Sequence, residues 1–271
     1  MPAAALFLLL AAAISLGMAA VWLAVVKGAG SGWVDTVWSF LVGGAGVAAA
    51  LVPVSDWEGD EQRRLLMAAV AALWSCRLGL HILRRTLKGG EDPRYTKLQE
   101  EWGERWRGRL FLFLQIQAAA ALLLTTTIFA AARNPAMGWQ WSDIAGIAII
   151  VIAVVGEGIA DAQLARFRDD DTNGGKVCDV GLWGLSRHPN YFFQWLGWVG
   201  YAVVAIGPAG DWGWGWLALG GPTLMYWLLV HVSGIPPLEA HMMRSRGAVF
   251  TAYIKRVNAF WPGAQKREQT I

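Results

Sequence analysis

The stretch GLWGLSRHPNYFFQWLGWVGY, residues 181–201, decides how this chain folds. It opens with a glycine, passes through the polar run SRHPN at 186–190, and then enters an apolar segment that still carries Gln194. A surface helix would sort its polar groups to one face, whereas here they gather at the start of a segment apolar enough to enter a bilayer. Charged groups at membrane depth are costly and usually functional. The stretch therefore predicts a membrane helix with a functional site at its mouth.

The rest of the chain has the composition of a membrane protein. Of its 271 residues, 55% are hydrophobic and only 16% are charged, which lies outside the averages of soluble proteins. A helix needs about 20 apolar residues to cross the hydrocarbon core. Seven stretches meet this requirement, at about 3–26, 33–53, 65–84, 110–131, 140–158, 190–207 and 212–233. The first lacks a charged n-region, so we expect it to be retained.

These spans predict the fold class and the domain organisation. We expect an all-α, polytopic membrane protein with seven transmembrane helices, formed as a single domain over residues 1–271. Its cytoplasmic loops are expected around 84–109, 159–190 and 234–271. Nothing in the sequence indicates the oligomeric state.

The distribution of basic residues predicts the orientation. With the N-terminus outside, Arg63, Arg64 and Arg133 are the only Lys or Arg on that side, and the other 20 of the 23 lie in or toward the cytoplasm. This asymmetry follows the positive-inside rule and predicts a multi-pass protein of the cytoplasmic (inner) membrane with a cytoplasmic C-terminus. The net charge of +3 is then explained either by the membrane topology together with anionic lipid head groups, or by an anionic ligand. It requires no nucleic-acid partner.

Neither a metal site nor a soluble nucleotide fold is expected. Cys76 and Cys178 are too few and too scattered for a thiolate site, and the four histidines show no HxxxH or HExxH spacing. The run GGAG at 43–46 lies inside a span and lacks the strand of a βαβ unit. Small residues within a span predict close packing between helices.

The third span carries charge inside the membrane. Arg77, His81 and Arg85 recur at intervals of four, so they share one face of a helix. A charge at the bilayer centre costs roughly 2.5–3.5 kcal/mol, so we expect Arg77 and His81 to face the interior or a wet cavity, whereas Arg85 can snorkel. Asp35, near the start of the second span, is either an exposed helix cap or a carboxylate on the substrate side.

The longest polar segment, KGGEDPRYTKLQEEWGERWRGR at 88–109, follows the third span. Its tryptophans and alternating charges predict a helix that either lies on the cytoplasmic leaflet or connects two spans in solvent. In both cases Arg94, Tyr95 and Arg105 can reach a ligand that enters from the cytoplasm.

Two consecutive helices present polar residues to the same membrane mouth. Glu157, Asp161 and Arg168 lie on a single stripe of the fifth span and its extension. Asn190 and Gln194 are one turn apart on the next span, on a face expected to look toward that stripe. The alternative is a salt-bridged helix end with no ligand.

Together these motifs resemble a known family. The opening block, with ADAQLARFR at 160–168 before it and VSGIPPLEAHMM at 232–243 and AYIKRVNAFWP at 252–262 after it, looks like the C-terminal domain of the steroid 5-alpha-reductase family. The likeness to that family's uncharacterised bacterial relatives covers essentially the whole chain and includes VDTVW at 34–38 and GEDPRY at 90–95. Sterol reductases and isoprenylcysteine carboxyl methyltransferases are more distantly similar. The resemblance implies a seven-helix membrane enzyme that holds NADPH in a cytoplasm-facing cavity.

The resemblance also implies roles for single residues. Asn190 stands where the family's asparagine contacts the nicotinamide carboxamide, and Glu157 stands where the reductases usually carry another amide. Asp161 and Arg168 match residues that hold the adenosine and phosphate portion, and Lys176 replaces an arginine there. The predicted cofactor-binding residues are Glu157, Asp161, Arg168, Lys176, Arg187, His188, Asn190, Gln194, Trp198, Glu239, His241, Arg94, Arg105 and Tyr253.

The sequence departs from the family's pattern in two places. Phe193-Gln194 replaces the usual Gly-Glu after the asparagine motif, and the Gln-Glu pair of the steroid enzymes' second helix is missing. The resemblance therefore does not specify a steroid substrate. The position of the reductases' proton-donating tyrosine falls at or beside His81.

The chemistry of the residues agrees with a nicotinamide reductase. NADPH carries a pyrophosphate and a 2′-phosphate, so its site needs clustered cations. Hydride addition to an enone places negative charge on the carbonyl oxygen, which an acid must neutralise. The predicted acid is His81, with Arg77 behind it to hold the oxyanion and with Asp35 and Tyr95 as competitors. The expected substrate is an apolar, lipid-like molecule, a steroid or isoprenoid enone, that enters from the bilayer.

Two other functions remain open at this point. The first is S-adenosylmethionine-dependent methyl transfer of the isoprenylcysteine carboxyl methyltransferase type. S-adenosylmethionine has no phosphate, so its binding would not require the clustered cations. The second is a transporter with an intramembrane polar pathway, which usually shows an internal repeat that this chain lacks.

Overall fold

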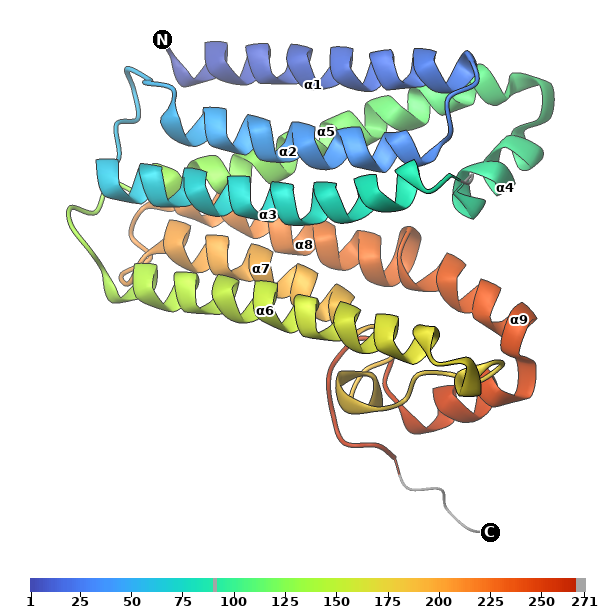
Figure 1. Ribbon diagram of the computed structural model, residues 1–271. Helices are drawn as coiled ribbons and strands as arrows, with labels where there is room; N and C mark the ends of the chain where they lie inside the picture. The colour runs from blue at the N-terminus through green and yellow to red at the C-terminus, as the bar shows by residue number, and fades with distance from the viewer. Residues whose placement is uncertain (90–91, 267–271) are drawn as a thin grey trace. The chain divides into compact units, whose positions relative to one another are not determined.

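The structure is a computed structural model that describes residues 1–89 and 92–266. Gly90 and Glu91 of the GEDPRY motif lie outside the described residues. Within that part of the chain the secondary structure is helical, without a strand (Figure 1). The α-helices are α1 (Ala3–Val26), α2 (Gly32–Leu51), α3 (Glu61–Leu87), α4 (Pro93–Trp102), α5 (Trp106–Ala132), α6 (Trp141–Asp169), α7 (Pro189–Ile206), α8 (Gly220–Trp227) and α9 (Ile235–Arg256). Five short helices connect them: η1 (Gly103–Arg105), η2 (Asp171–Asn173), η3 (Gly181–Gly184), η4 (Gly213–Leu219) and η5 (Leu228–Val232).

The chain is a multi-pass membrane protein. Six helical stretches among the described residues are long and apolar enough to cross a bilayer, and they comprise α1, α2, α3, α4 with α5, α6, and the stretch from η4 to α9. The all-α class is confirmed. Helix α7 is 18 residues long and is not among the six, so the seventh span stays a prediction, as does the orientation of the termini.

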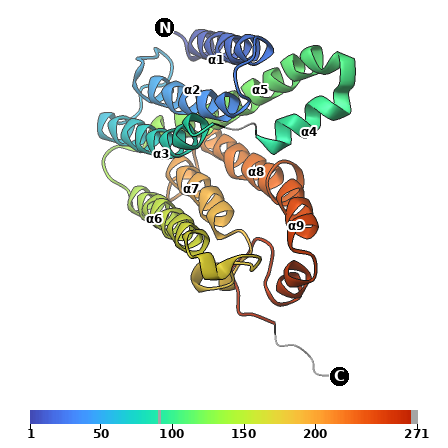
Figure 2. The same ribbon diagram turned by 45° about the vertical axis from the view of Figure 1, so that its right-hand side comes forward.

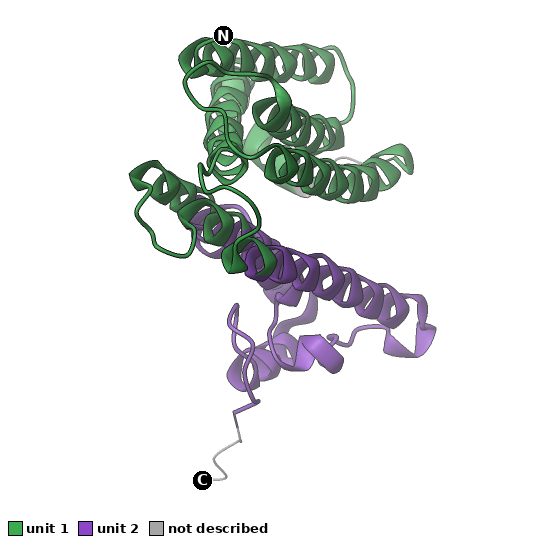
Figure 3. Ribbon diagram, turned by 90° about the vertical axis from the view of Figure 1, so that its left-hand side faces the viewer, with its two compact units in different colours: residues 1–144, 201–221 green, residues 145–200, 222–271 purple. Residues whose placement is uncertain are grey.

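The chain divides into two compact units (Figure 3). Unit 1 consists of residues 1–144 and 201–221, and unit 2 consists of residues 145–200 and 222–271. Each unit is assembled from parts that are distant in sequence, and each is described separately below. The single domain predicted from the sequence stays a prediction.

Unit 1 is built from helices that approach one another through glycine. Figure 2 shows α1, α2, α3 and α5 side by side. A Cβ added at Gly43 of α2 would lie 2.0 Å from the Ser75 Cβ of α3, and one at Gly46 would lie 2.5 Å from Ile128 of α5. The glycines of the GGAG run therefore allow α2 to contact both neighbours, as the sequence predicted.

The arginines predicted to lie outside are all used to hold unit 1 together. Arg63 and Asp143 form an ion pair at 2.9 Å, with both side chains only 3% exposed. Arg133 donates to the carbonyls of Ala49 and Val52, and Arg64 donates to those of Ala50 and Leu51. Two guanidinium groups thus cap the last carbonyls of α2, where a cation also complements the helix dipole.

Unit 2 is organised around α6 and α7, which also pack through glycine. A Cβ at Gly200 of α7 would lie 2.5 Å from Ile150 and 2.7 Å from the Gly146 carbonyl of α6. Helix α9 is bent at Gly247, whose φ of 49° is left-handed and favours glycine. Beyond the bend, Phe250, Tyr253 and Val257 form a small buried core. The bend thereby lets the C-terminal segment return to the polar run at 186–190.

Candidate functional site

The polar run at 186–190 is held in unit 2 by the C-terminal segment of the chain. The Ser186 hydroxyl donates to the carbonyls at 259 and 260, at 3.2 and 2.9 Å, and the Arg187 backbone N–H donates to the Asn258 carbonyl at 2.9 Å. Tyr253, a predicted cofactor ligand, is buried, and its hydroxyl donates to the Trp183 carbonyl at 2.6 Å. Tyr253 therefore fastens the turn before α7, and its hydroxyl already has an acceptor.

Glu239 of α9 orients the two ionisable residues of that run. The Arg187 guanidinium donates to both carboxylate oxygens of Glu239, at 2.7 and 3.2 Å, and the His188 Nε2 lies 3.0 Å from Oε1. Because an ionised carboxylate only accepts hydrogen bonds, Nε2 carries the proton. The bridge joins the start of α7 to the start of α9, which sequence spacing alone did not reveal.

His188 is a neutral imidazole with one nitrogen left over. Its side chain is 4% exposed, and burial lowers its pKa, aided by the charge of Arg187 and opposed by Glu239. The Nδ1 atom is buried and has no hydrogen-bond partner in the described part of the chain. A bare acceptor in a buried position is costly, so His188 is a place where a ligand or an ordered water fits.

Helices α6 and α7 bring two of the predicted residues into contact. The Asn190 Nδ2 donates to the Asp161 Oδ1 at 3.3 Å. Glu157 on α6 and Gln194 and Trp198 on α7 are buried. The sequence predicted that the polar faces of these two helices look toward each other. In unit 2 the two faces meet at the Asn190–Asp161 pair.

Exposed cations follow this pair along the chain. Arg168 lies in the last turn of α6, and Lys176 lies in the connection after that helix. The side chains of Arg166, Arg168 and Lys176 form no ion pair within residues 1–89 and 92–266. His241 is exposed on α9. These groups remain available to an anionic ligand.

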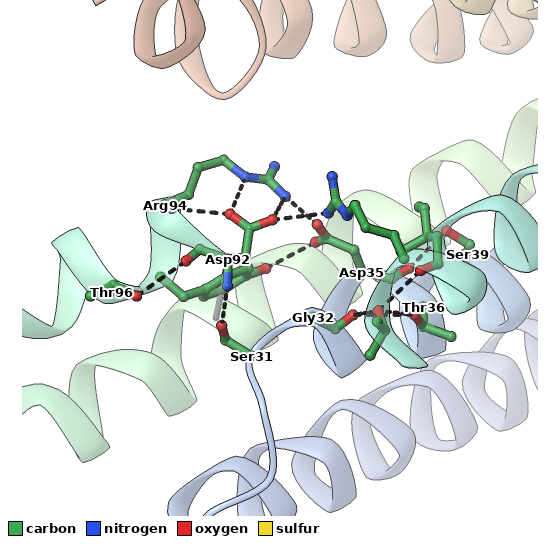
Figure 4. A network of polar contacts seen from close by, with 12 residues as sticks. Ser31, Gly32, Asp35, Thr36, Ser39, Asp92, Arg94 and Thr96 are labelled. Carbon is green, nitrogen blue, oxygen red and sulfur yellow. Dashed lines mark hydrogen bonds and ion pairs between the residues drawn. The ribbon is translucent and has the colours of Figure 1, made fainter. Parts of the chain in front are cut away.

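A second polar cluster lies in unit 1 (Figure 4). Arg94 of α4 pairs with Asp92 at 2.9 Å and also with Asp35 of α2, while Arg85 of α3 pairs with Asp92 at 3.0 Å. Burial alone would raise the pKa of Asp92, but the hydrogen bonds and charge of Arg94, with the charge of Arg85, hold it below its usual value. Tyr95 is 3% exposed, and its hydroxyl donates to Asp35 at 3.0 Å and accepts from Gln117 at 3.2 Å.

This cluster fastens α4 to the bundle. Asp35 is not an exposed cap, because its carboxylate is shared by Arg94 and Tyr95. Both hydrogen-bonding positions of the Tyr95 hydroxyl are occupied, so Tyr95 has no free proton to offer a substrate. The role of Gln117 was not predicted from the sequence, although its amide within an otherwise apolar span is a visible signal.

The remaining predicted residues of unit 1 are His81, Arg77 and Arg105. His81 is exposed on α3, and Arg77, one turn earlier on the same helix, is half-buried. Arg105 is exposed in η1. Their predicted roles stay predictions.

An open groove of about 520 Å³ runs along one flank of α6. Apolar side chains such as Val155, Ile159 and Phe193 form most of its wall, and Gln163 also lines it. The Gln163 Oε1 accepts from the Leu182 N–H at 3.0 Å. No group of three or more His, Cys, Asp or Glu residues in the described chain is arranged to hold a metal ion.

Comparison with known proteins shows one relationship. No curated protein and no solved structure matches the chain. The family model described as a protein of unknown function, DUF1295, matches residues 21–257, which include α2 to α9 and both polar clusters. The chain therefore belongs to the DUF1295 family, a steroid 5-alpha-reductase-like family.

Proposed function

We propose that the protein is an NADPH-dependent membrane reductase that transfers a hydride to an apolar, lipid-like acceptor. The observation that carries this proposal is the Asn190–Asp161 contact between α7 and α6, beside a polar run that Glu239 holds in place. An amide and a carboxylate are the groups that recognise a carboxamide and a ribose by hydrogen bonds. Membership of a steroid 5-alpha-reductase-like family supports the same reading.

The residues of unit 2 fit a phosphorylated dinucleotide. Arg166, Arg168 and Lys176 follow Asp161 along the chain without carboxylate partners in the described residues, and arginine binds phosphate by paired charge-assisted hydrogen bonds. The unpartnered Nδ1 of His188 offers an acceptor for an N–H group. When bound, the cofactor supplies the hydride. The chain binds it, orients it and excludes water.

The cations favour NADPH over S-adenosylmethionine, which has no phosphate. Methyl transfer remains the second candidate function, because the same motifs of this chain also resemble those of the isoprenylcysteine carboxyl methyltransferases. A titration of each cofactor against the purified chain distinguishes the two.

The cofactor is tested by calorimetric titration of NADPH into the full chain in nanodiscs. Arg168→Gln removes one charge-assisted contact worth about 1.5–3 kcal/mol, so the NADPH affinity should fall at least about tenfold. Affinity for NADH, which lacks the 2′-phosphate, should fall less if Arg168 holds that group. Arg107→Gln is the matched control, because Arg107 is an exposed arginine of unit 1. Equal losses in both variants, or binding of S-adenosylmethionine instead of NADPH, would contradict the proposal.

The proton donor is tested separately. We keep His81 as the proposed acid, with Arg77 stabilising the oxyanion. In an assay of NADPH oxidation with a 3-keto-4-ene sterol and an isoprenoid enal, His81→Ala should lower kcat by a factor of about 10² or more and leave the NADPH affinity unchanged. Unaltered kcat would remove His81 from this role.

A further inference from the structure

The groove of about 520 Å³ on α6 lies entirely within unit 2. Its lining includes Val151, Ile152, Val155 and Ile159, whose side chains are about half exposed, from 46% at Ile159 to 56% at Ile152. The volume falls within the range of about 300–1,000 Å³ that is typical of small-molecule sites. Because α6 is long and apolar enough to cross a bilayer, this apolar lining is suited to a hydrocarbon chain.

The groove lies on a different side of α6 from the predicted cofactor residues. Successive residues of an α-helix are about 100° apart, so residues two apart point away from each other. Asp161 follows Ile159 by two residues, and Arg168 follows Arg166 by two. In contrast, Ile159, Gln163 and Arg166 recur at intervals of four and three and therefore share one face. A ligand in the groove therefore does not compete with one bound at Asp161.

Gln163 brings an unused hydrogen-bond donor to the groove. Its Oε1 accepts from the Leu182 N–H at 3.0 Å, which orients the amide and leaves the Nε2 group over. No hydrogen bond of this Nε2 is found among the described residues. Gly181 also lines the groove, with a φ of 59°, and a Cβ there would lie 2.6 Å from the Nε2 atom. The glycine therefore leaves room for the amide, which can donate to an oxygen of a ligand.

Arg166 adds a positive charge one turn beyond Gln163. Its side chain is exposed and forms no ion pair within residues 1–89 and 92–266. The carboxylate of Asp170, one turn further on, accepts from the N–H and hydroxyl of Thr172, at 2.9 and 2.7 Å. A rise of about 1.5 Å per residue places Arg166 about 4.5 Å beyond Gln163 along the axis. This face of α6 therefore runs from an apolar groove, through a neutral donor, to a cation.

We propose that this face of α6 binds one anionic glycerophospholipid, with an acyl chain in the groove, an ester carbonyl at Gln163 and the phosphate at Arg166. The order of these three parts in the lipid matches the order of the groups along the helix. Arginine binds phosphate through charge-assisted hydrogen bonds, and the amide donates to the ester carbonyl. A lipid of the surrounding bilayer reaches the site without leaving the membrane.

This inference goes beyond the proposed function. The phospholipid is a bound stabilising ligand and not the hydride acceptor, since it offers no conjugated carbonyl. Of the three cations available to an anionic ligand, the inference assigns Arg166 to the lipid and leaves Arg168 and Lys176 to the cofactor. Binding of the lipid requires no nucleotide.

Native mass spectrometry of the full chain, released from detergent micelles at increasing lipid concentrations, measures this binding. The probes are dimyristoyl phosphatidylglycerol and dimyristoyl phosphatidylcholine, whose chains are identical and saturated, and glycerol 3-phosphate, which has no chain. One copy of phosphatidylglycerol should bind saturably and about fivefold more tightly than phosphatidylcholine, as expected for one basic residue near the membrane surface. Glycerol 3-phosphate should not bind, because burial of the chain supplies most of the interaction.

Three substitutions test the three parts of the site. Arg166→Gln should weaken phosphatidylglycerol binding about tenfold and remove the preference for it over phosphatidylcholine. Gln163→Glu keeps an acceptor for the Leu182 N–H but replaces the donor with an anion, so binding should weaken at least about fivefold. Ile159→Trp fills the groove and should prevent saturable binding.

Matched controls carry the same changes elsewhere. Arg107→Gln removes a charge from an exposed position of α5, and Leu73→Trp enlarges a side chain of α3 that is 70% exposed. Both should bind the lipid like the parent chain. Thermal unfolding checks that each variant is folded, and phosphatidylglycerol should raise the Tm of the parent chain and the controls more than that of the three site variants.

Three results would overturn this inference. They are binding of lipid without saturation, equal affinity of the parent chain for the two lipids, and unchanged phosphatidylglycerol binding in both Arg166→Gln and Gln163→Glu. NADPH titrations separate the two proposals, because Ile159→Trp should keep the cofactor affinity of the parent. A loss of NADPH affinity in Arg166→Gln with unchanged lipid binding would assign this arginine to the cofactor instead. A chain that binds the lipid but not NADPH would support this inference and remove the proposed function.

Discussion

At the scale of single residues, Glu239 links two helices of unit 2 through its carboxylate. Its carboxylate pairs with Arg187 and accepts from His188, so it joins the start of α9 to the start of α7. Replacing one partner of a largely buried ion pair leaves the other charge without compensation. The consequence is larger than for the Arg256–Asp179 pair, whose side chains are each about one-third exposed.

We expect Glu239→Gln to destabilise unit 2 by on the order of 3 kcal/mol, because the Arg187 guanidinium stays buried without its anion. Asp179→Asn is the control and should cost about 0–1 kcal/mol, as exposed ion pairs do. Chemical unfolding of the purified protein in detergent measures both. Equal destabilisation by the two substitutions would show that the Glu239 bridge is not special.

His188 predicts a dependence of stability on pH. Burial lowers its pKa in the folded state, so below the ordinary histidine pKa of about 6.5 the unfolded chain binds a proton that the folded chain does not. The stability contributed by the neutral imidazole is therefore present above pH 6.5 and is lost as pH falls through the folded pKa. The temperature at which half of the protein is unfolded should decrease as the pH is lowered from 7 to 5. His188→Gln should make this temperature less dependent on pH over the same range. A variant that keeps the full slope would assign the effect to another group.

At the scale of elements, the contact between α2 and α3 depends on the absence of a side chain. A Cβ at Gly43 would lie 2.0 Å from that of Ser75, whereas nothing lies within 4 Å of a Cβ at the adjacent Gly44. The two glycines therefore form a matched pair that separates packing from helix propensity.

Gly43→Ala should destabilise unit 1 by about 1–3 kcal/mol through overpacking. Gly44→Ala should be neutral or stabilising by up to about 1 kcal/mol, because alanine is the better helix former. Thermal unfolding monitored by circular dichroism measures the difference. A Gly43→Ala protein as stable as Gly44→Ala would mean that α2 and α3 separate at no cost.

At the scale of the whole molecule, the orientation in the membrane is open to a direct measurement. The positive-inside rule places the loop between α1 and α2 in the cytoplasm and the loop between α2 and α3 outside. After Cys76 and Cys178 are replaced by serine, single cysteines at Gly28 and Glu58 report these two loops. A membrane-impermeant maleimide should label position 58 in intact cells and position 28 only after permeabilisation. The reverse pattern would invert the predicted topology.

The features that could be predicted from the sequence depend on local patterns, whereas the others depend on contacts between residues that are distant in the sequence. The helical class and most spans follow from local hydropathy, because a segment of about 20 apolar residues must pair its backbone internally in a bilayer. The Asn190–Asp161 contact was also predictable, since a repeat of about four residues places polar groups on one face of each of two consecutive helices.

The sequence by itself thus determined a helical membrane chain, its polar stripes and its family resemblance. Only the tertiary structure decided that Glu239 holds Arg187 and His188, that Asp35 and Tyr95 are occupied with Arg94 and Gln117, and that a π turn brings His231 beside Tyr226. The physical reason is the same in each case. These pairs join residues that are distant in sequence or depend on a change of helical register, and neither is encoded in the period of a single helix.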